Sequence, residues 1–162
     1  MNLKTLASLV STALLSLPGM AADVTYRNDV APMLKKHCYE CHSVEAEAPS
    51  MAEFKLDEEK YKKAKVGPRL DTYEHLLQLV NGMSTGAFMR RLDDGTSPYS
   101  GGKPGNMHKY LCDKDTPAEC AANLVVLKAW VGEGGWNLNR MAPRGDVPAL
   151  TKEQMDKLKL KY

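Results

Sequence analysis

The sequence predicts a small all-α domain with long loops. Its 162 residues are enough for one domain, and a hydrophobic content of 43% allows that domain a packed core. Helix-starting and helix-ending residues recur along the chain, whereas no two segments alternate polar and apolar residues as the strands of a hairpin do. The sequence also lacks the internal repeats of a solenoid.

Charge and aromatic content narrow the class of protein. The 22 basic residues nearly balance the 20 acidic ones, which leaves a formal net charge of +2. A nucleic-acid-binding protein needs a strong basic excess, so we expect no nucleic-acid partner. Aromatic residues make up only 7% of the chain. A core this poor in aromatic rings predicts that another group helps to fill its centre.

Residues 1–21 are predicted to be a secretory signal peptide. Lys4 is their one charged residue, and the apolar stretch over 6–17 is too short to span a bilayer. A Pro-Gly pair ends this stretch, and cleavage is expected after Ala21. The alternative is a buried N-terminal helix. No later segment is apolar enough to cross a membrane, so we expect a soluble protein exported to the periplasm, an oxidising compartment.

Two helices are predicted in the first half of the mature chain. Residues 30–37 form a short helix with Pro32 in its first turn. Residues 71–81 form the second, which ends at an Asn-Gly pair. The polar residues 43–67 between them are predicted to be a surface loop with room for a short helix.

The second half is predicted to contain a short helix over 85–92, a loop and a long helix. Residues 93–105 are loop because they hold four glycines and two prolines. The long helix begins at Thr116, which caps it together with Glu119 in a capping box. It runs to residue 131, where a glycine-rich segment ends it.

The motif Cys38-Tyr39-Glu40-Cys41-His42 carries the chemistry. C-x-x-C-H is the attachment signature of c-type haem. Two thiols three residues apart on one helical turn can reach the two vinyl groups of one porphyrin, and the next residue places an imidazole beneath the iron. We therefore predict one covalent haem c, bound through Cys38 and Cys41, with His42 as the proximal ligand. The helical domain is then wrapped around this haem, which fills its centre.

Two other uses of this motif are less consistent with the sequence. A thioredoxin-like redox pair needs a preceding strand and a βαβ context, and neither is predicted. A zinc site needs two further ligands, which Cys112 and Cys120 could supply, but their spacing fits no common zinc pattern. Predicted export favours haem, because bacteria attach haem c outside the cytoplasm.

The sixth ligand of the iron is predicted to be Met107. It follows a glycine-rich loop and precedes the long helix, and a loop brings a side chain over the open haem face more easily than a helix core position does. The alternatives are His108, Met141 and Met83. The remaining candidates are expected to serve the core or the surface: Met33, Met89, His37 and His75.

Two cysteines, Cys112 and Cys120, are left once Cys38 and Cys41 are assigned to the haem. In an oxidising compartment they predict a disulfide, which would close residues 113–119 into a loop and brace the Met107 segment against the long helix. The alternative is two free thiols.

Two groups of basic residues are candidates for charge interactions. The run over 60–65 either steers an acidic redox partner or forms a solvated face. Arg69, Arg90 and Arg91 are candidates to neutralise the haem propionates.

The residues from 30 to 34 followed by Cys38–His42 resemble the start of a class I-type cytochrome c domain. More narrowly, the chain is similar to the planctomycete-type cytochrome c group. That group has an R-L-D-T segment, found here from Arg69 to Thr72, and a closing helix with Leu-x-x-Trp and glycine, found here at Leu127, Trp130 and Gly132. The resemblance spans residues 26–135. It implies a distal methionine before the last helix, where Met107 stands, although the family's methionine usually precedes proline and Met107 precedes His108.

Together these observations predict a domain over 22–135 and a C-terminal extension over 136–162, packed on or next to it, with a last short helix beginning at Thr151. The expected function is that of a monohaem one-electron carrier that cycles between Fe(II) and Fe(III), rather than an enzyme, and its expected partners are redox proteins. A methionine ligand suits this role, since six-coordinate iron has no free site for a substrate. The alternatives are a haem enzyme or gas- or peroxide-binding protein with an open sixth site, and an electron-transfer subunit of a larger oxidoreductase.

Overall fold

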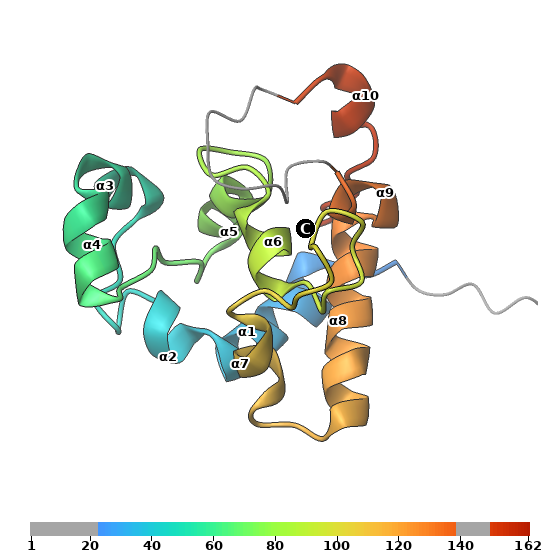
Figure 1. Cartoon of the computed structure of the whole chain (residues 1–162), viewed down its shortest axis with the longest axis horizontal. Helices are drawn as coiled ribbons and strands as arrows, with labels where there is room; N and C mark the ends of the chain where they lie inside the picture. The colour runs from blue at the N-terminus through green and yellow to red at the C-terminus, as the bar shows by residue number, and fades with distance from the viewer. Residues whose placement is uncertain (1–22, 139–149) are drawn as a thin grey trace, which may run out of the picture.

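The computed structural model describes residues 23–138 and 150–162, and every regular element within those ranges is helical. This confirms the all-α prediction. The chain begins with a π-helical turn, η1 (Tyr26–Val30), which continues directly into α1 (Ala31–His37) (Figure 1). After one residue, α2 (Tyr39–His42) follows. The predicted signal peptide lies outside the described residues.

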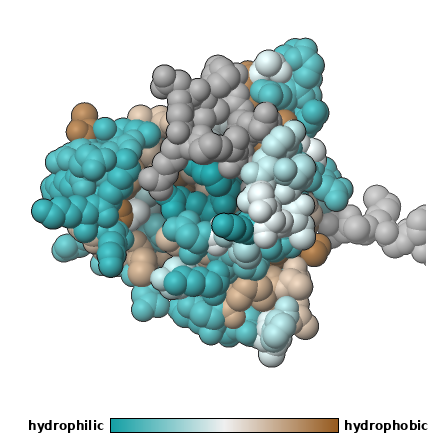
Figure 2. All heavy atoms as spheres, in the orientation of Figure 1, coloured by the Kyte–Doolittle hydropathy of each residue, from teal (hydrophilic) through white to brown (hydrophobic). Residues whose placement is uncertain are grey.

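Two short helices occupy the region that the sequence predicts to be mainly loop. They are α3 (Met51–Leu56) and α4 (Glu58–Ala64), and they lie on the side of the molecule opposite the long helix α8 (Figure 1). Ser50 and Glu53 form a complete capping box at the start of α3, and the Asp57 side chain caps α4. Figure 2 shows that the surface of this hairpin is mostly hydrophilic.

The middle of the chain forms α5 (Tyr73–Val80), α6 (Ala87–Leu92) and α7 (His108–Cys112). The first two correspond to predicted helices and begin two residues later than expected. The third is a helix that the sequence did not predict. Its N-cap residue is Met107, so the proposed sixth ligand stands at the start of a helical turn and not in an open loop.

The long helix α8 (Pro117–Val131) begins at the predicted capping box and ends at the predicted glycine. The Thr116 side chain accepts a hydrogen bond from the backbone N–H of Glu119, and the Glu119 carboxylate accepts one from the backbone N–H of Thr116. Two shorter helices follow, α9 (Glu133–Trp136) and α10 (Lys152–Met155).

The core lies between α8, η1, α5 and α6. The η1 turn and α7 pack on α8, and α6 packs on α5 and α7. Both tryptophans, Trp130 and Trp136, are fully buried, and Phe88 contacts both with ring centroids 6.5 Å and 6.3 Å away. Phe88 and the two tryptophans thus form one buried cluster. Other fully buried large side chains include Leu34, Leu76, Met89, Leu111 and Leu127.

The last residues of the chain join η1 to α8. The carbonyl of Lys161 accepts hydrogen bonds from the Tyr26 backbone N–H (2.7 Å) and from the indole N–H of Trp130 (2.8 Å). The neighbouring Leu160 carbonyl accepts a bond from the Tyr73 hydroxyl (2.7 Å). The Tyr162 ring stacks on Tyr26 at 5.8 Å. This segment therefore contributes directly to the packing of the first and the long helices.

Across the described residues, no helix combines the length and the apolar character that a membrane span requires.

Candidate haem-binding site

The two cysteines of the C-x-x-C-H motif lie on one helical turn. Cys38 is the residue that begins α2, and its carbonyl accepts hydrogen bonds from the backbone N–H groups of Cys41 (3.1 Å) and His42 (2.9 Å). Residues three apart on a helix lie on the same face, so both sulfur atoms can reach one planar ligand. Cys38 is half-buried and Cys41 is exposed, which places the site at the protein surface.

The imidazole of His42 is held by a backbone carbonyl. Its Nδ1 lies 2.8 Å from the carbonyl oxygen of Pro68, so Nδ1–H donates and the tautomer is fixed. The Nε2 lone pair is then available to a metal. This is the arrangement by which metal-binding histidines are oriented through the nitrogen that does not bind the metal.

Gly67 leaves room for the His42 ring. A Cβ atom at this position would lie 2.4 Å from Cε1 of His42, closer than any real carbon contact. The ring therefore packs directly against the backbone before Pro68. Any larger residue at position 67 would push the imidazole away from the Pro68 carbonyl.

The surroundings of His42 favour its neutral form. Burial lowers the pKa of His42, and the positive charge of Arg91 lowers it further, against the opposing effect of the Pro68 carbonyl. A neutral imidazole is the form that binds a metal.

The Arg69–Thr72 segment forms hydrogen bonds with the C-x-x-C-H motif and with the residues that follow it. The Leu70 N–H donates to the His42 carbonyl (2.9 Å), and the Asp71 carboxylate accepts bonds from the Val44 N–H (2.8 Å) and Arg69 Nε (3.0 Å). Burial raises the pKa of Asp71, but these hydrogen bonds outweigh it and hold the pKa below its usual 3.8. The Tyr39 hydroxyl donates to the Asp71 carbonyl at 3.1 Å. The R-L-D-T segment thus fixes the backbone on both sides of His42.

These observations fit a covalent haem better than the two alternatives. A thiol–disulfide redox site needs a lowered thiol pKa, whereas burial raises the pKa of Cys38 to about 12. A zinc site built from the four cysteines would need them together. Instead, Cys112 and Cys120 lie next to each other with Cα atoms 4.8 Å apart, and neither Cys38 nor Cys41 belongs to this pair.

The Met107 backbone is held beside Arg91. Its backbone N–H donates to the Arg91 carbonyl (2.9 Å), and the Arg91 guanidinium donates to the Asn106 side chain (3.0 Å). Gly105 lies against the same carbonyl, where a Cβ would lie 2.3 Å from the oxygen. The positive charge of Arg91 acts on His42, so the segment around Arg91 and Met107 lies within electrostatic reach of the His42 imidazole. The partly buried Met107 side chain packs against the core.

The alternative sixth ligands have other surroundings. His108 Nδ1 lies 3.0 Å from the Leu92 carbonyl, and its Nε2 lies 3.8 Å from the Cys112 sulfur. Met83 is 55% exposed beyond the end of α5. Met141 lies outside the described residues. Met89, expected in the core, is fully buried there.

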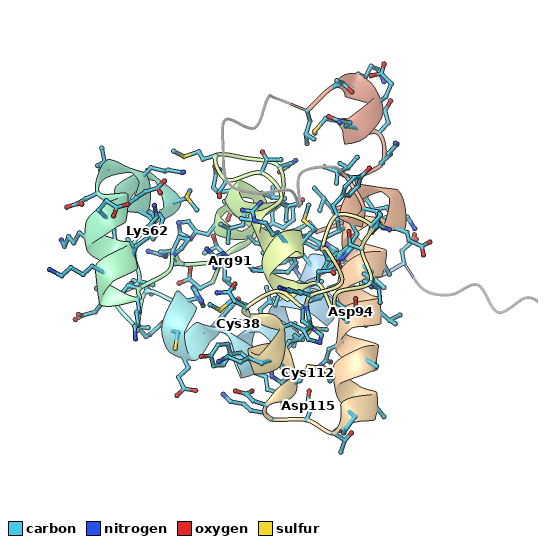
Figure 3. The ribbon with its side chains drawn as sticks, viewed as in Figure 1. Cys38, Lys62, Arg91, Asp94, Cys112 and Asp115 are labelled. Carbon is cyan, nitrogen blue, oxygen red and sulfur yellow. A yellow bond between two sulfur atoms is a disulfide. The ribbon has the colours of Figure 1, made fainter. Side chains whose placement is uncertain are left out.

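Cys112 and Cys120 lie side by side between α7 and α8, with Cα atoms 4.8 Å apart, a separation that suits a disulfide. The residues between them contact the haem-binding motif, which the sequence did not predict. Lys114 Nζ donates to the Lys36 carbonyl (3.0 Å) and to the Glu40 carboxylate (3.1 Å). Figure 3 shows Asp115 below Cys112 on this connecting loop.

Two of the basic residues singled out in the sequence, Lys62 and Arg69, form ion pairs. In the 60–65 run, Lys62 forms ion pairs with Glu58 (2.8 Å) and Glu59 (3.2 Å), and Figure 3 shows it on α4, well away from Cys38. Arg69 pairs with Asp71 at 3.0 Å. The 60–65 run is therefore a solvated helix face whose charge is partly neutralised by neighbouring acids.

The comparisons with known proteins agree with this site. Residues 25–162 match the family model described as PccH cytochrome c. The solved structure of the monohaem cytochrome PccH from Geobacter sulfurreducens is 40% identical, with a TM-score of 0.68, and the match covers 86% of this chain and 99% of that one. No curated protein matched the chain.

The matched family carries the predicted cofactor. The C-x-x-C-H motif, the oriented His42 and the match along residues 25–162 lead to the same conclusion. The expectation of a monohaem c-type cytochrome with one covalently attached haem c is confirmed, while the narrower likeness to the planctomycete-type group stays a resemblance. The chain belongs to the PccH cytochrome c family.

Proposed function

We propose that this chain is an exported one-electron carrier in which Cys38 and Cys41 bind the haem and His42 and Met107 are the two axial ligands. The observation that carries the proposal is the hydrogen bond between His42 Nδ1 and the Pro68 carbonyl. It leaves Nε2 as the one ring atom able to bind iron, in a motif whose two sulfurs lie on the same helical turn. Family membership supports electron transfer as the activity.

The protein's contribution is to hold the ligands still. When bound, the haem supplies an iron that gains or loses one electron. The Pro68 carbonyl and Gly67 hold the His42 ring in one orientation, and the hydrogen bond that the Met107 N–H donates to the Arg91 carbonyl holds the Met107 backbone. A thioether ligand favours Fe(II) and raises the potential. Two fixed ligands change little between oxidation states, which suits rapid electron exchange.

The exposed Cys41 marks the edge at which redox partner proteins would approach. Its neighbour Glu40 is ion-paired with Lys114 at 3.1 Å, so the surface beside this edge carries charges of both signs. We expect recognition to be short-lived and only moderately dependent on salt, because screening acts on a small net charge.

Export and the disulfide are proposed together. Residues 1–21 have the pattern of a signal peptide, and an exported chain would meet conditions that oxidise Cys112 and Cys120. The proposed division is a cytochrome domain over 22–135 and an extension over 136–162. The hydrogen bonds of Leu160 and Lys161 to the domain support packing of the extension on it.

Two measurements test the proposal. Mass spectrometry of the mature protein should find one haem and the loss of residues 1–21. Spectra should show low-spin ferric haem with the weak far-red band of a methionine–iron bond, and reversible one-electron reduction. High-spin haem that rapidly binds CO would instead indicate an open sixth site, as in an enzyme or a gas-binding protein. Co-elution with other subunits from native cell envelopes would indicate a subunit of a larger oxidoreductase.

A further inference from the structure

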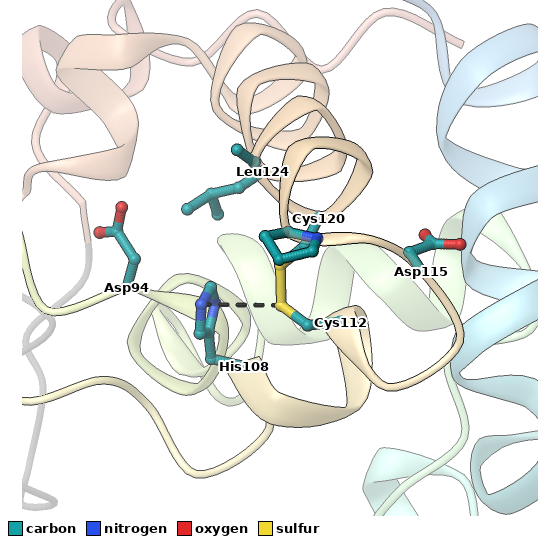
Figure 4. A pocket seen from close by; sticks show the side chains of 8 residues that line it. Asp94, His108, Cys112, Asp115, Cys120 and Leu124 are labelled. Carbon is teal, nitrogen blue, oxygen red and sulfur yellow. Dashed lines mark hydrogen bonds between the residues drawn. A yellow bond between two sulfur atoms is a disulfide. The ribbon is translucent and has the colours of Figure 1, made fainter.

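Three metal-binding side chains meet at a place away from the C-x-x-C-H motif. They are His108 and Cys112 on α7 and Cys120 on α8, and their ligand atoms all lie within 4.8 Å of one another. Figure 4 shows the imidazole directed at the two sulfurs. Sulfur and imidazole nitrogen are the donors that Zn²⁺ prefers, and the proposed haem attachment uses none of these three side chains.

His108 is oriented as a metal ligand would be. Its Nδ1 lies 3.0 Å from the Leu92 carbonyl and donates to it, so the lone pair is on Nε2. Nε2 lies 3.8 Å from the Cys112 sulfur. In a tetrahedral zinc site with ordinary bond lengths, a sulfur and a nitrogen ligand are separated by about 3.6 Å. The α7 turn therefore already holds this pair of atoms close to ligand spacing.

A pocket of about 400 Å³ gives access to the cluster. Two carboxylates, Asp94 and Asp115, lie on its walls, on either side of the three side chains (Figure 4). Burial raises the pKa of Asp94, but hydrogen bonds from Thr96 outweigh it, so this group stays ionised. The pocket thus gives a cation access to the three side chains and leaves space for water as a fourth ligand.

We propose that, when Cys112 and Cys120 are reduced, this cluster binds Zn²⁺ through His108 Nε2 and the two sulfurs. Reduction of the disulfide consumes two electrons and two protons and gives two thiols. The electrons come from a dithiol or a phosphine, which becomes a disulfide or a phosphine oxide. Zn²⁺ then binds as two thiolates form, and two protons are released. Metal binding and disulfide formation therefore exclude each other.

The haem-loaded protein is suited to the test, because haem attachment consumes Cys38 and Cys41 and leaves two thiols among the four cysteines. The holoprotein is reduced with a phosphine, desalted without oxygen and titrated with zinc against a chromophoric chelator. We expect one zinc per chain in the reduced protein and none in the oxidised protein. The zinc X-ray absorption edge should give Zn–S distances of about 2.3 Å and Zn–N distances of about 2.0–2.1 Å.

Two variants separate this site from adventitious binding. His108→Gln should weaken zinc binding by more than the roughly 10–100-fold that loss of an outer-shell partner costs, while both thiols still titrate. His75→Gln is the matched control, because His75 pairs with Asp71 and Thr72 outside the pocket, and its affinity should be unchanged.

Any of four results would overturn the proposal. Three concern zinc: the absence of zinc binding in the reduced protein, equal binding in the oxidised protein, and unchanged affinity in His108→Gln. The fourth is loss of helical circular dichroism on reduction, because the site needs α7 and α8 in place. Haem spectra of the same samples detect any effect on the haem ligands separately.

Discussion

The carboxylate of Asp115 lies 3.0 Å from Nε2 of His37, the residue immediately before Cys38. Asp115 belongs to the loop between α7 and α8, and it also pairs with Lys36 and accepts a bond from Asn123 (2.7 Å). Both side chains of the His37–Asp115 pair are almost fully buried. The loop between α7 and α8 therefore packs against the helix that leads into the C-x-x-C-H motif.

Asp115→Asn should destabilise the protein in a pH-dependent way. The hydrogen bond from Lys36 is the main cause that holds the pKa of Asp115 below its usual 3.8. A carboxyl whose pKa is lowered in the folded state stabilises that state above its unfolded pKa, and loses this effect as the pH falls through its folded pKa. Denaturant unfolding should thus show a full difference from wild type above about pH 5 that shrinks below about pH 3.8. A difference independent of pH would contradict this assignment.

Cys112→Ser should lower thermal stability and leave the haem attached. Closing a loop of this size stabilises the folded state by about 2–3 kcal/mol in the chain-entropy model. Thermal melts of oxidised wild type and variant measure the loss, and wild type kept reduced should resemble the variant. Loss of bound haem in Cys112→Ser would mean that the cysteine pairs are assigned wrongly.

Met107→Ala should abolish the far-red methionine–iron band and lower the midpoint potential. The shift should be a fraction of the roughly 0.8 V range over which axial ligands set haem potentials. Met155→Ala is the control, since Met155 is exposed on α10 and is no candidate ligand. An unchanged spectrum in Met107→Ala would transfer the role to His108, Met141 or Met83, which the matching variants would then identify.

Gly67→Ala should disturb the proximal ligand. The added methyl group would lie 2.4 Å from the His42 ring, so the imidazole must move away from the Pro68 carbonyl. We expect a changed Soret spectrum and weaker retention of low-spin haem on heating. Gly134→Ala serves as the comparison, because its Cβ would meet Lys157 at an ordinary 3.5 Å. Identical spectra for Gly67→Ala and wild type would show that the ring is not held in this way.

Tyr73→Phe should cost about 0.5–1.5 kcal/mol of unfolding free energy, the net value of one hydrogen bond. The hydroxyl donates to the Leu160 carbonyl at 2.7 Å, which ties α5 to the last residues. Chemical denaturation measures the effect, and Tyr99→Phe, on the exposed loop after α6, should leave stability unchanged. Equal stability of Tyr73→Phe and wild type would mean that this bond contributes nothing net.

The local signals in the sequence were sufficient for much of the fold. The Thr116–Glu119 box predicted the start of α8 because a capping box involves only residues three apart. The same signal is present at Ser50–Glu53, but residues 43–67 are mostly polar, so the sequence predicts a surface loop with room for only a short helix there. In α7, a helix of five residues is too short for a periodic pattern.

The long-range partners could not be predicted from the sequence. Pro68 lies 26 residues from His42, and its carbonyl could have been matched to the imidazole only by knowing how the chain turns at Gly67. The pairing of His37 with Asp115 likewise depends on the path of the loop between α7 and α8, which carries Asp115. The chemistry of the C-x-x-C-H motif could be predicted because its residues are adjacent in the sequence. The contacts that orient His42 form only in the tertiary structure.

The hydrogen bonds made by the carbonyls of Leu160 and Lys161 have a consequence for the order of maturation. Ribosomes make the N-terminal part of a chain first, so the cysteines at 38 and 41 emerge long before these two residues. The hydrogen bonds that join η1 to α8 cannot form until Leu160 and Lys161 have been synthesised. The two cysteines of the motif are thus synthesised before the contacts that join η1 to α8 can form.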